Sequence, residues 1–268
     1  MIPRSLDPSI PSAGGVHPSA LIGPDVILGP GCEVGPFCVI EARVTAGAAN
    51  RFAPGVAIGG APMDTKYHGE DTEVRIGSGN TFFEYATAHR ATGSGNATVI
   101  GNRNFVMAYV HIAHNCRVGS DCVIANGVQL AGYVELGDGA NIGGLAGVHQ
   151  FCRVGALAMV GACSYVNKDI PPFVLAAGSP CRVRGLNVVG LRRAGIGEPV
   201  LAVLHRAHRV IYRAGLNLTE AMSTIEAELL PASAPDRGQE QLEELVRFVR
   251  SSTRGIELRS SRQEQEES

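Results

Sequence analysis

The chain has 268 residues, of which 45% are apolar and 18% are charged, and its formal net charge at pH 7 is −2. This near balance of charge excludes a general electrostatic footprint for nucleic acid, and an aromatic content of 5% without tryptophan argues against a base-stacking surface. No apolar run approaches the roughly 20 residues of a membrane span, and the first residues lack the apolar core of a secretory signal. Seven cysteines without a C-x-x-C pair favour a reduced, cytoplasmic chain.

A six-residue period runs through residues 16–166. Every sixth position is apolar with three exceptions, which are Asp64, Glu70 and Ser94, and glycine often follows that position. This period fits neither a helix nor continuous alternation, but it fits short strands separated by bends, with one side chain of each hexad pointing inward and glycine easing the bend. We therefore predict a parallel β-helix of hexapeptide repeats.

A small or β-branched residue lies two positions before each inward position. Five of the seven cysteines occupy this place: Cys32, Cys38, Cys116, Cys122 and Cys152. We expect them to be small inward fillers at the corners rather than catalytic or metal-binding thiols.

Two segments interrupt the repeat. Residues 61–74 (APMDTKYHGEDTEV) are polar, and residues 90–97 (RATGSGNA) are rich in small residues, but the six-residue phase resumes after each. We interpret both segments as loops inserted between coils, and loops on a rigid scaffold are natural places for binding groups.

After residue 166 the pattern changes. The proline-rich segment 169–180 (DIPPFVLAAGSP) is expected to end the coils, and three helices are expected beyond it, at residues 198–215, 217–230 and 239–250. The polar tail from about residue 257 is expected to fray. The predicted domains are a β-helix over residues 1–184, with a polar extension at 1–15, and an α-helical C-terminal domain over residues 185–268.

Proteins with this hexad pattern, which the chain resembles, wind left-handed with three hexads per coil and commonly pack as trimers. Residues eighteen apart would then stack about 4.8 Å apart. Stacking places His114, Gly132 and Gln150 in one column, with Asn115, Tyr133 and Phe151 in the next. An isolated histidine is more often an ordinary polar surface residue, but this cluster from three coils, with His149 adjacent, indicates a functional site.

The residue types in the cluster limit the chemistry. The sequence has no Ser-His-Asp set in plausible register, no Walker phosphate loop and no nucleophile elbow. A neutral imidazole is suited to take a proton from a hydroxyl, and a glycine N–H one coil away can stabilise an oxyanion. We therefore predict direct acyl transfer from a thioester to a sugar hydroxyl or amine. A histidine-bound zinc, as in carbonic-anhydrase-like members of this fold, is the competing interpretation, but a third ligand is not obvious and no metal or other cofactor is predicted.

Narrower motifs resemble one family, the UDP-N-acetylglucosamine O-acyltransferases that start lipid A biosynthesis. They cover nearly the whole chain in the family's order: MDTKYHGE (63–70), HIAHNCRVG (111–119), LAGYVELG (130–137), GGLAGVHQFCRVGA (143–156), NKDIPPFVLAAGSP (167–180), GLNVVGLRRAG (185–195), IYRAG (211–215) and STRGI (252–256).

The resemblance implies roles for individual residues. His114 would be the general base for the glucosamine 3-hydroxyl, with Asn115 as its neighbour, and the Gly132 N–H would hold the oxyanion. The residues implied to position the sugar and its diphosphate are Asp64, Lys66, His111, Tyr133, His149 and Gln150. Asn187 and Arg193 would serve the nucleotide and the phosphopantetheine, and Met159 and Ala162 the acyl chain. The donor would be a 3-hydroxyacyl chain on acyl carrier protein, an acidic partner that the arginines of residues 182–193 would attract.

Four positions depart from the family pattern. Asn115 stands where Asp is common, Tyr133 where His is common, Val189 where a Glu can contact the nucleotide, and Ala194 where a second Arg is common. A neutral amide still accepts a hydrogen bond from imidazole but stabilises imidazolium less. These departures leave open a 3-amino sugar nucleotide or another sugar as acceptor, or a non-catalytic scaffold, and the sequence does not give the acyl chain length.

Overall fold

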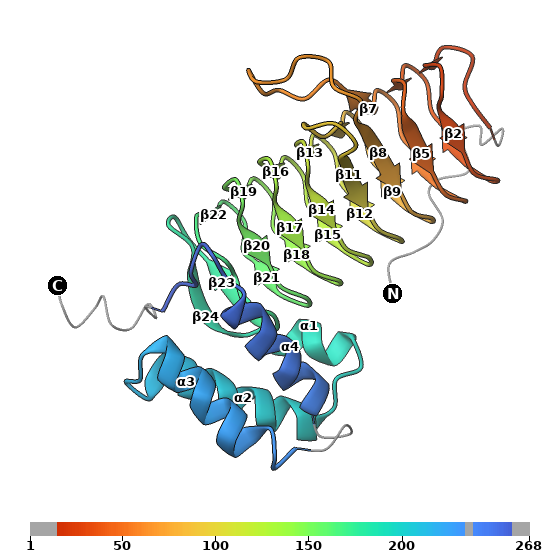
Figure 1. Ribbon diagram of the computed structural model, residues 1–268. Coiled ribbons are helices and arrows are strands. Elements are labelled where there is room, and N and C mark those ends of the chain that lie inside the picture. The colour runs from red at the N-terminus through yellow and green to blue at the C-terminus, as the bar shows by residue number, and fades with distance from the viewer. Residues whose placement is uncertain (1–14, 234–237, 259–268) are drawn as a thin grey trace.

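The computed structural model describes residues 15–233 and 238–258, so most of the predicted N-terminal extension and frayed tail lie outside the described residues. Short strands wind into a stack of coils, each with three strands that join three different sheets. The fold is the parallel β-helix that the repeat predicts, with the left-handed winding that the resemblance implies, and helices cover its C-terminal end (Figure 1).

The three sheets form the faces of a triangular prism. The eight-stranded sheet comprises β1 (Leu21–Ile22), β4 (Val39–Ile40), β7 (Ala57–Gly60), β10 (Thr87–His89), β13 (His111–Ile112), β16 (Gln129–Leu130), β19 (Gly147–Val148) and β22 (Tyr165–Val166). The seven-stranded sheet comprises β2 (Ile27–Leu28), β5 (Val44–Ala46), β8 (Glu73–Ile76), β11 (Ala97–Ile100), β14 (Arg117–Val118), β17 (Glu135–Leu136) and β20 (Arg153–Val154). The nine-stranded sheet comprises β3 (Glu33–Val34), β6 (Arg51–Phe52), β9 (Thr81–Phe82), β12 (Phe105–Val106), β15 (Val123–Ile124), β18 (Asn141–Ile142), β21 (Met159–Val160), β23 (Val174–Ala177) and β24 (Arg182–Leu186).

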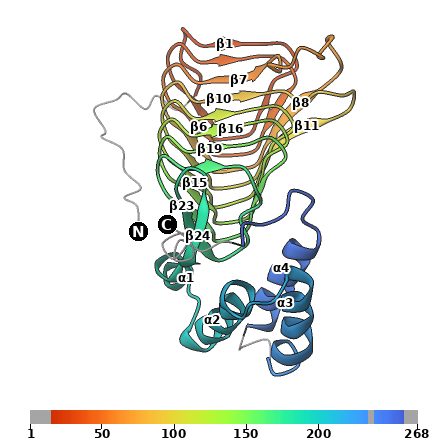
Figure 2. The same cartoon turned by 90° about the vertical axis from the view of Figure 1, so that its left-hand side faces the viewer.

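The predicted spacing of eighteen residues is confirmed in the central coils, where His111 pairs with Gln129 and Gln129 with Gly147. Each inserted loop lengthens one coil: Ala57 pairs with Thr87, and Thr87 pairs with His111. Both loops leave the same corner of the prism, between the eight- and seven-stranded sheets, and project beyond it (Figure 2).

From Val34 onward the apolar hexad positions form the core, as predicted, and the five corner cysteines are buried with them, whereas Val16 and Ile22 in the first coil are exposed. Burial raises the pKa of both Cys116 and Cys122 to about 12, so these thiols stay protonated and unreactive.

The glycines that follow the inward positions have a different role from the one expected. The residue with positive φ in a bend is usually not one of them; it comes two positions later and is often not glycine, as at Asp121 after Gly119. What requires glycine is the backbone of the next coil. A Cβ on Gly101 would lie 2.5 Å from the Gly119 carbonyl oxygen, and one on Gly137 would lie 2.5 Å from Ala156 N.

Three asparagines form a hydrogen-bonded column inside one corner. The Asn50 carboxamide oxygen accepts from the backbone and side-chain N–H groups of Asn80, and the Asn80 oxygen accepts from Asn104 N, each at 2.9 Å. Asn80 Nδ2 also donates to the Gly101 carbonyl. The column therefore satisfies backbone groups that would otherwise be buried without partners.

The exit from the coils differs from the prediction that residues 169–180 end them. β23 lies within this segment and pairs in parallel with β21, and β24 then pairs antiparallel along its free side. The proline-rich stretch was misread because Pro171 and Pro172 precede the strand rather than interrupt it.

The three predicted C-terminal helices are present, with two differences. α2 (Glu198–Arg213) and α4 (Gln239–Arg250) match closely, and Asn217 and Glu220 form the predicted capping box. The middle helix, however, is α3 (Leu218–Thr224) continued by a π-helical turn, η1 (Ile225–Leu229), and the short α1 (Val188–Arg193) was not predicted.

After α4, residues 252–257 return to the prism and are called the C-terminal strap here. Ile256 bridges to Asp169, and Ser252 Oγ donates to the Asp169 carboxylate at 2.8 Å. Glu257, where fraying was expected to begin, is buried and lies 2.8 Å from Arg182 Nη1.

Replacing Asn80 by alanine should lower the free energy of unfolding by at least about 2 kcal/mol, because it leaves the Asn104 N–H and the Gly101 carbonyl without these buried partners. Urea titration followed by circular dichroism measures the change. The control Asn126→Ala, at an exposed corner, should change stability by less than about 0.5 kcal/mol. Equal effects of both substitutions would contradict a structural role for the column.

Candidate active site

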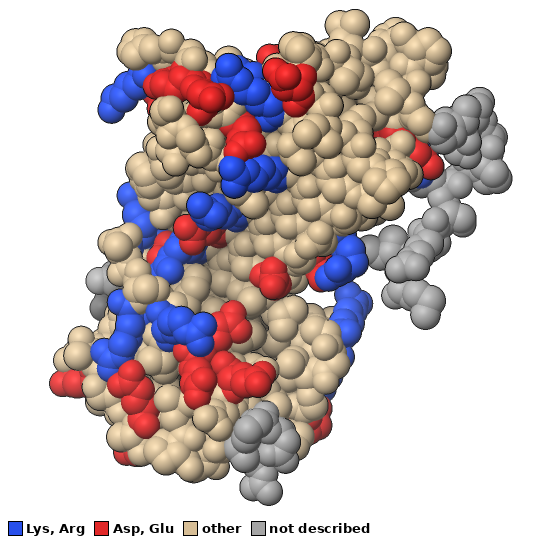
Figure 3. All heavy atoms as spheres, turned by 45° about the vertical axis from the view of Figure 1, so that its right-hand side comes forward, with Lys and Arg blue, Asp and Glu red and all other residues tan. Residues whose placement is uncertain are grey.

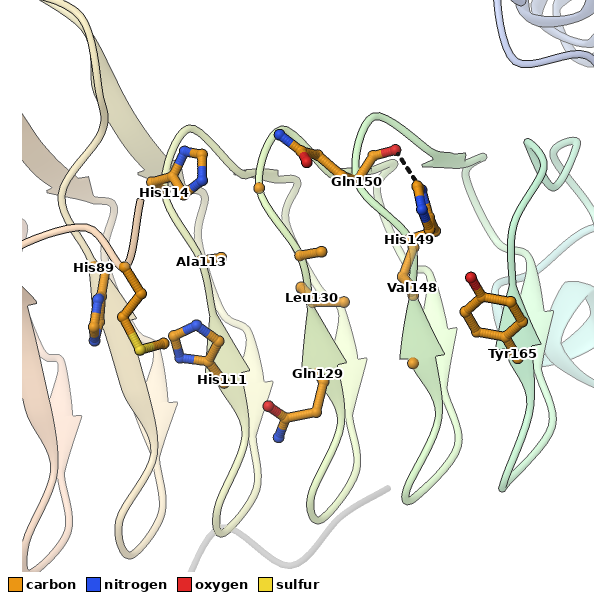
Figure 4. A pocket seen from close by; sticks show the side chains of 14 residues that line it. His89, His111, Ala113, His114, Gln129, Leu130, Val148, His149, Gln150 and Tyr165 are labelled. Carbon is orange, nitrogen blue, oxygen red and sulfur yellow. Dashed lines mark hydrogen bonds between the residues drawn. The ribbon is translucent and has the colours of Figure 1, made fainter. Parts of the chain in front are cut away.

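A cleft of about 520 Å³ lies along the eight-stranded sheet, where outward side chains of successive coils line up. His111, Gln129, Gly147 and Tyr165 share one register, and His114, Gly132 and Gln150 follow at the adjoining corner. In Figure 4 the Gln150 side chain extends along the strip toward His114. The stacking predicted for His114, Gly132 and Gln150 is therefore present.

His114 is nearly buried, with 7% of its surface exposed. Its Nδ1 lies 2.9 Å from the Asn115 carboxamide oxygen, which also accepts from the backbone N–H of Thr92. Asn115 Nδ2 donates to the Thr92 carbonyl. Because a backbone N–H can only donate and a backbone carbonyl can only accept, these two contacts fix which end of the Asn115 amide is the oxygen. Because an acceptor faces Nδ1, this nitrogen carries the proton in the neutral imidazole, and the lone pair of that form is on Nε2.

Gly132 lies directly against the imidazole. A Cβ on Gly132 would be 2.5 Å from both Cε1 and Nε2 of His114, so only glycine fits. The Gly132 N–H has no hydrogen-bond partner among the described residues, whereas the flanking Ala131 and Tyr133 N–H groups both donate to carbonyls. The Nε2 side of the imidazole thus lies beside a backbone N–H that has no partner in the described part of the chain.

Two further histidines line the cleft beside the base. Burial, followed by the nearby His89 and His114, lowers the pKa of His111 to about 4, and burial also lowers the pKa of His89. The Thr87 hydroxyl lies 2.8 Å from His111 Nδ1, and the rings of His89 and His111 meet edge to face. Both are neutral at pH 7, so they offer hydrogen bonds rather than charge.

His149 lies at the exposed end of the cleft. Its Nδ1 is 3.1 Å from the Gln150 carbonyl oxygen and 3.2 Å from Arg254 Nη2 in the C-terminal strap. Arg254 also donates to the Asn167 carbonyl. The strap therefore brings a positive charge to the exposed end of the cleft.

The first loop brings a carboxylate near the base, although only Met63 of this loop lines the cleft itself. Asp64 Oδ2 lies 4.0 Å from His114 Nε2, and its Oδ1 accepts from the Lys66 backbone N–H at 3.0 Å. The Lys66 side chain is exposed and does not line the cleft. Of the two loop residues singled out in the sequence, Asp64 therefore lies close to the base.

Four of the candidate residues lie elsewhere on the chain. Asn187 caps α1, accepting from Gly190 N and donating to the Leu157 carbonyl, and Arg193 is exposed in the last turn of that helix. Met159 belongs to β21 in the nine-stranded sheet, and Ala162 is exposed at a corner after it. None of the four lines the cleft within one chain.

The structure adds cleft residues that sequence reasoning missed. His89 lies over Ala113 because the second loop lengthens its coil, so a count of eighteen does not find it. Gln129 and Tyr165 would have appeared had the same count been started from His111. Thr92, which contacts Asn115, and Arg254, which contacts His149, lie beside the cleft rather than in its lining. They had no signal in the repeat, since one is in a loop and the other in the strap.

The described residues contain no group of three or more His, Cys, Asp or Glu arranged to hold a metal ion. Within residues 15–233 and 238–258, no helix has the length and apolar character needed to cross a membrane.

Comparisons with known proteins point in one direction. A family profile described as Udp N-acetylglucosamine O-acyltransferase, Domain 2, matches residues 169–257, and a hexapeptide-repeat transferase profile matches residues 97–132. The chain is 50% identical over 211 residues to the acyl-[acyl-carrier-protein]–UDP-N-acetylglucosamine O-acyltransferase of Paracidovorax citrulli, covering 78% of this chain and 79% of that one. It is 46% identical over 220 residues to the enzyme of the same name from Verminephrobacter eiseniae, covering 81% and 82%. Among solved structures, the UDP-N-acetylglucosamine acyltransferase from Campylobacter jejuni matches with a TM-score of 0.79 and 31% identity, covering 91% of this chain and 99% of that one.

Acid should destabilise the fold through the cleft histidines. The unfolded chain protonates His111 near its ordinary pKa of 6.5, whereas the folded chain resists protonation until about pH 4. The free energy of unfolding should therefore fall as the pH is lowered from about 6.5 toward 4. Denaturant titrations across this range should show a shallower fall for His111→Gln, while His205→Gln, at an exposed position of α2, should keep the original slope. Identical slopes for His111→Gln and the unchanged protein would contradict this account.

Proposed function

This chain belongs to the UDP-N-acetylglucosamine O-acyltransferase family, and from that premise we propose that its cleft moves a 3-hydroxyacyl chain from acyl carrier protein to the 3-hydroxyl of UDP-N-acetylglucosamine. The observation that carries the proposal is the pairing of the free His114 Nε2 with the unpaired Gly132 N–H. This is the reaction that opens lipid A biosynthesis, and a cytoplasmic location is part of the proposal.

In this proposal one group of the site serves each chemical step. His114 Nε2 takes the proton as the sugar hydroxyl oxygen attacks the thioester carbonyl, and the oxyanion that forms is held by the Gly132 N–H. When the C–S bond breaks, the phosphopantetheine sulfur leaves and receives the proton from His114. Asn115 holds the imidazole through Nδ1 in every step.

The remaining cleft residues have binding roles in this proposal. His111, His149 and Gln150 meet the sugar and its diphosphate with hydrogen-bond donors, while Asp64 approaches from the first loop, where the Lys66 backbone N–H holds its carboxylate. Tyr133 borders the sugar with its ring, which meets His114 edge to face at 5.5 Å.

A homotrimer would complete the site, because Met159, Ala162, Asn187 and Arg193 are outside the cleft of their own chain. The corner between the nine- and eight-stranded sheets carries an exposed apolar column, whose members are Phe37, Tyr85, Tyr109 and Leu145. Phe37 and Leu145 are 73% and 71% exposed. A row of such exposed apolar side chains is typical of a surface that another protein chain covers. Packing this column around a threefold axis would turn the Met159 face of one copy toward the His111 face of the next.

The acyl carrier protein is acidic, so it would approach basic side chains near α1. Arg192 and Arg193 close this helix, and Arg192 is paired with Glu198 at 2.7 Å while Arg193 is exposed. Figure 3 shows basic and acidic side chains side by side, with a broad uncharged area between the charged groups. The carrier would thus meet local arginines rather than a continuous basic field.

The proposal predicts O-acylation of UDP-N-acetylglucosamine when the protein is incubated with 3-hydroxyacyl carrier proteins of several chain lengths. His114→Ala should lower kcat on the order of 10²–10⁴-fold through loss of the base. Gly132→Ala should lower it by about 10²-fold, because the added Cβ displaces the imidazole. Mass spectrometry of the product gives both the acyl chain length and the bond formed.

The controls are His205→Ala, at an exposed helical position, and Gly144→Ala, where a Cβ would be no closer than 3.4 Å to its neighbours. Both should retain activity. Tyr133 and Val189 depart from the family pattern, so a 3-amino UDP-sugar is also tested as acceptor. Turnover of the amino sugar alone would mean that the acceptor group is an amine rather than a hydroxyl. No turnover with any acceptor would leave a binding scaffold.

Light scattering should give a particle of three times the 28.0 kDa chain mass. Tyr109→Glu places a charge in the proposed threefold contact and should yield monomers without acyltransferase activity. Arg117→Glu, an exposed charge reversal on the seven-stranded sheet, should remain trimeric. A monomeric unsubstituted protein with full activity would contradict the shared site.

A further inference from the structure

Thr92, in the second inserted loop, contacts the Asn115 side chain at three points. Its backbone N–H donates to Oδ1 at 2.9 Å, its hydroxyl donates to the same oxygen at 3.0 Å, and its carbonyl accepts from Nδ2 at 3.1 Å. Thr92 is 9% exposed, and its carbonyl is held from the other side by Asn96 Nδ2 at 2.9 Å. We call this set of contacts the amide clamp.

The direction of the Asn115 amide decides which nitrogen of His114 carries the proton. As the clamp holds it, Oδ1 faces His114 Nδ1, so the proton is on Nδ1. A reversed amide would turn the NH₂ group toward Nδ1, which would then have to accept, and the proton would move to Nε2. In that state the nitrogen that faces Gly132 has no lone pair for a substrate proton. A carboxylate at this position has no wrong direction, because both of its ends accept.

We propose that Thr92 is a positioning residue for the acyl transfer: its hydroxyl, added to the two backbone contacts of the clamp, holds Asn115 in the direction that selects the His114 tautomer able to act as a base. The effect on rate rests on the proposed function, whereas the effect on the tautomer does not. With the clamp, the neutral Asn115 can orient the base His114 as a carboxylate would. The second loop thereby has a role in the reaction.

The clamp also accounts for the hydroxyl of Tyr133. The Thr92 hydroxyl has a single proton, which it donates to Asn115, so the Tyr133 hydroxyl 3.2 Å away is its donor. Tyr133, Thr92 and Asn115 thus form one directed hydrogen-bond chain that ends at His114 Nδ1. The Tyr133 O–H is used within the protein and is not offered to the sugar.

The test is Thr92→Val, which removes the hydroxyl contact at nearly constant shape and keeps the two backbone contacts of residue 92, with Thr92→Ser as the variant that restores the hydroxyl. NMR of protein with ¹⁵N-labelled histidine reports the His114 tautomer without substrate, and the His114→Gln spectrum identifies the signals. We expect Nδ1–H in the unsubstituted protein and in Thr92→Ser, and a mixture of tautomers in Thr92→Val. The same substitution should lower kcat about threefold to tenfold and change the KM for the UDP-sugar by less than about twofold.

The decisive arm repeats Thr92→Val in an Asn115→Asp background. Because a carboxylate cannot present a donor, the loss of the Thr92 hydroxyl should then change kcat by less than about twofold relative to Asn115→Asp alone. The matched control is Thr98→Val, since the Thr98 hydroxyl accepts from the Asn115 backbone N–H at 2.9 Å and does not touch the amide. It should lower thermal stability and leave the tautomer unchanged.

A single Nδ1–H tautomer in Thr92→Val would overturn the proposal, and so would an equal loss of kcat from Thr92→Val with and without the Asn115→Asp substitution. If the unsubstituted protein transfers no acyl chain, the proposed function fails, but the substrate-free tautomer measurement still decides the role of Thr92.

Discussion

The parallel hydrogen-bond register between coils is the constraint on which both the core and the cleft depend. Each strand is too short to hold a conformation alone, so its inward and outward faces are set by the strands above and below it. The hydrogen bond from the Tyr133 backbone N–H to the His114 carbonyl belongs to this register, and it fixes Gly132 against the imidazole. A slip of one residue would expose the inward column and separate the base from the N–H that it adjoins.

The neutral and the charged groups around the cleft come from different parts of the chain. The coils supply neutral partners, since burial keeps His89 and His111 uncharged at pH 7. The charged side chains lie outside the coils: Asp64 is on the first loop and Arg254 is on the C-terminal strap. This division follows from packing, because side chains pressed between adjacent coils are partly desolvated, whereas loops and the strap can keep a charge hydrated.

The repeat predicted most of the prism because one inward residue in six is a strong and local signal. It also predicted the column of His114, Gly132 and Gln150, which depends only on counting within unbroken coils. Sequence reasoning failed where counting fails. The extra residues of the second loop moved His89 out of the expected register, and the contacts of Thr92 and Arg254 arise from tertiary packing that no periodicity encodes. The proline-rich exit hid β23 because Pro171 and Pro172 are typical of a loop, whereas the strand that follows them is set by its pairing with β21.

The separation of Met159 from His111 has a geometric consequence. The two residues lie on different faces of the prism, and a corner with Tyr85, Tyr109 and Leu145 stands between them. A side chain does not reach around such a corner, so one chain does not bring both residues to one substrate. When two different faces of one chain meet each other in successive copies, the contact is heterologous, and it closes into a ring if the rotation between copies is a whole fraction of a turn. A three-sided prism that uses two faces in this way leaves its third face, the seven-stranded sheet, outward, which agrees with the charged Arg117 and Glu135 found exposed there.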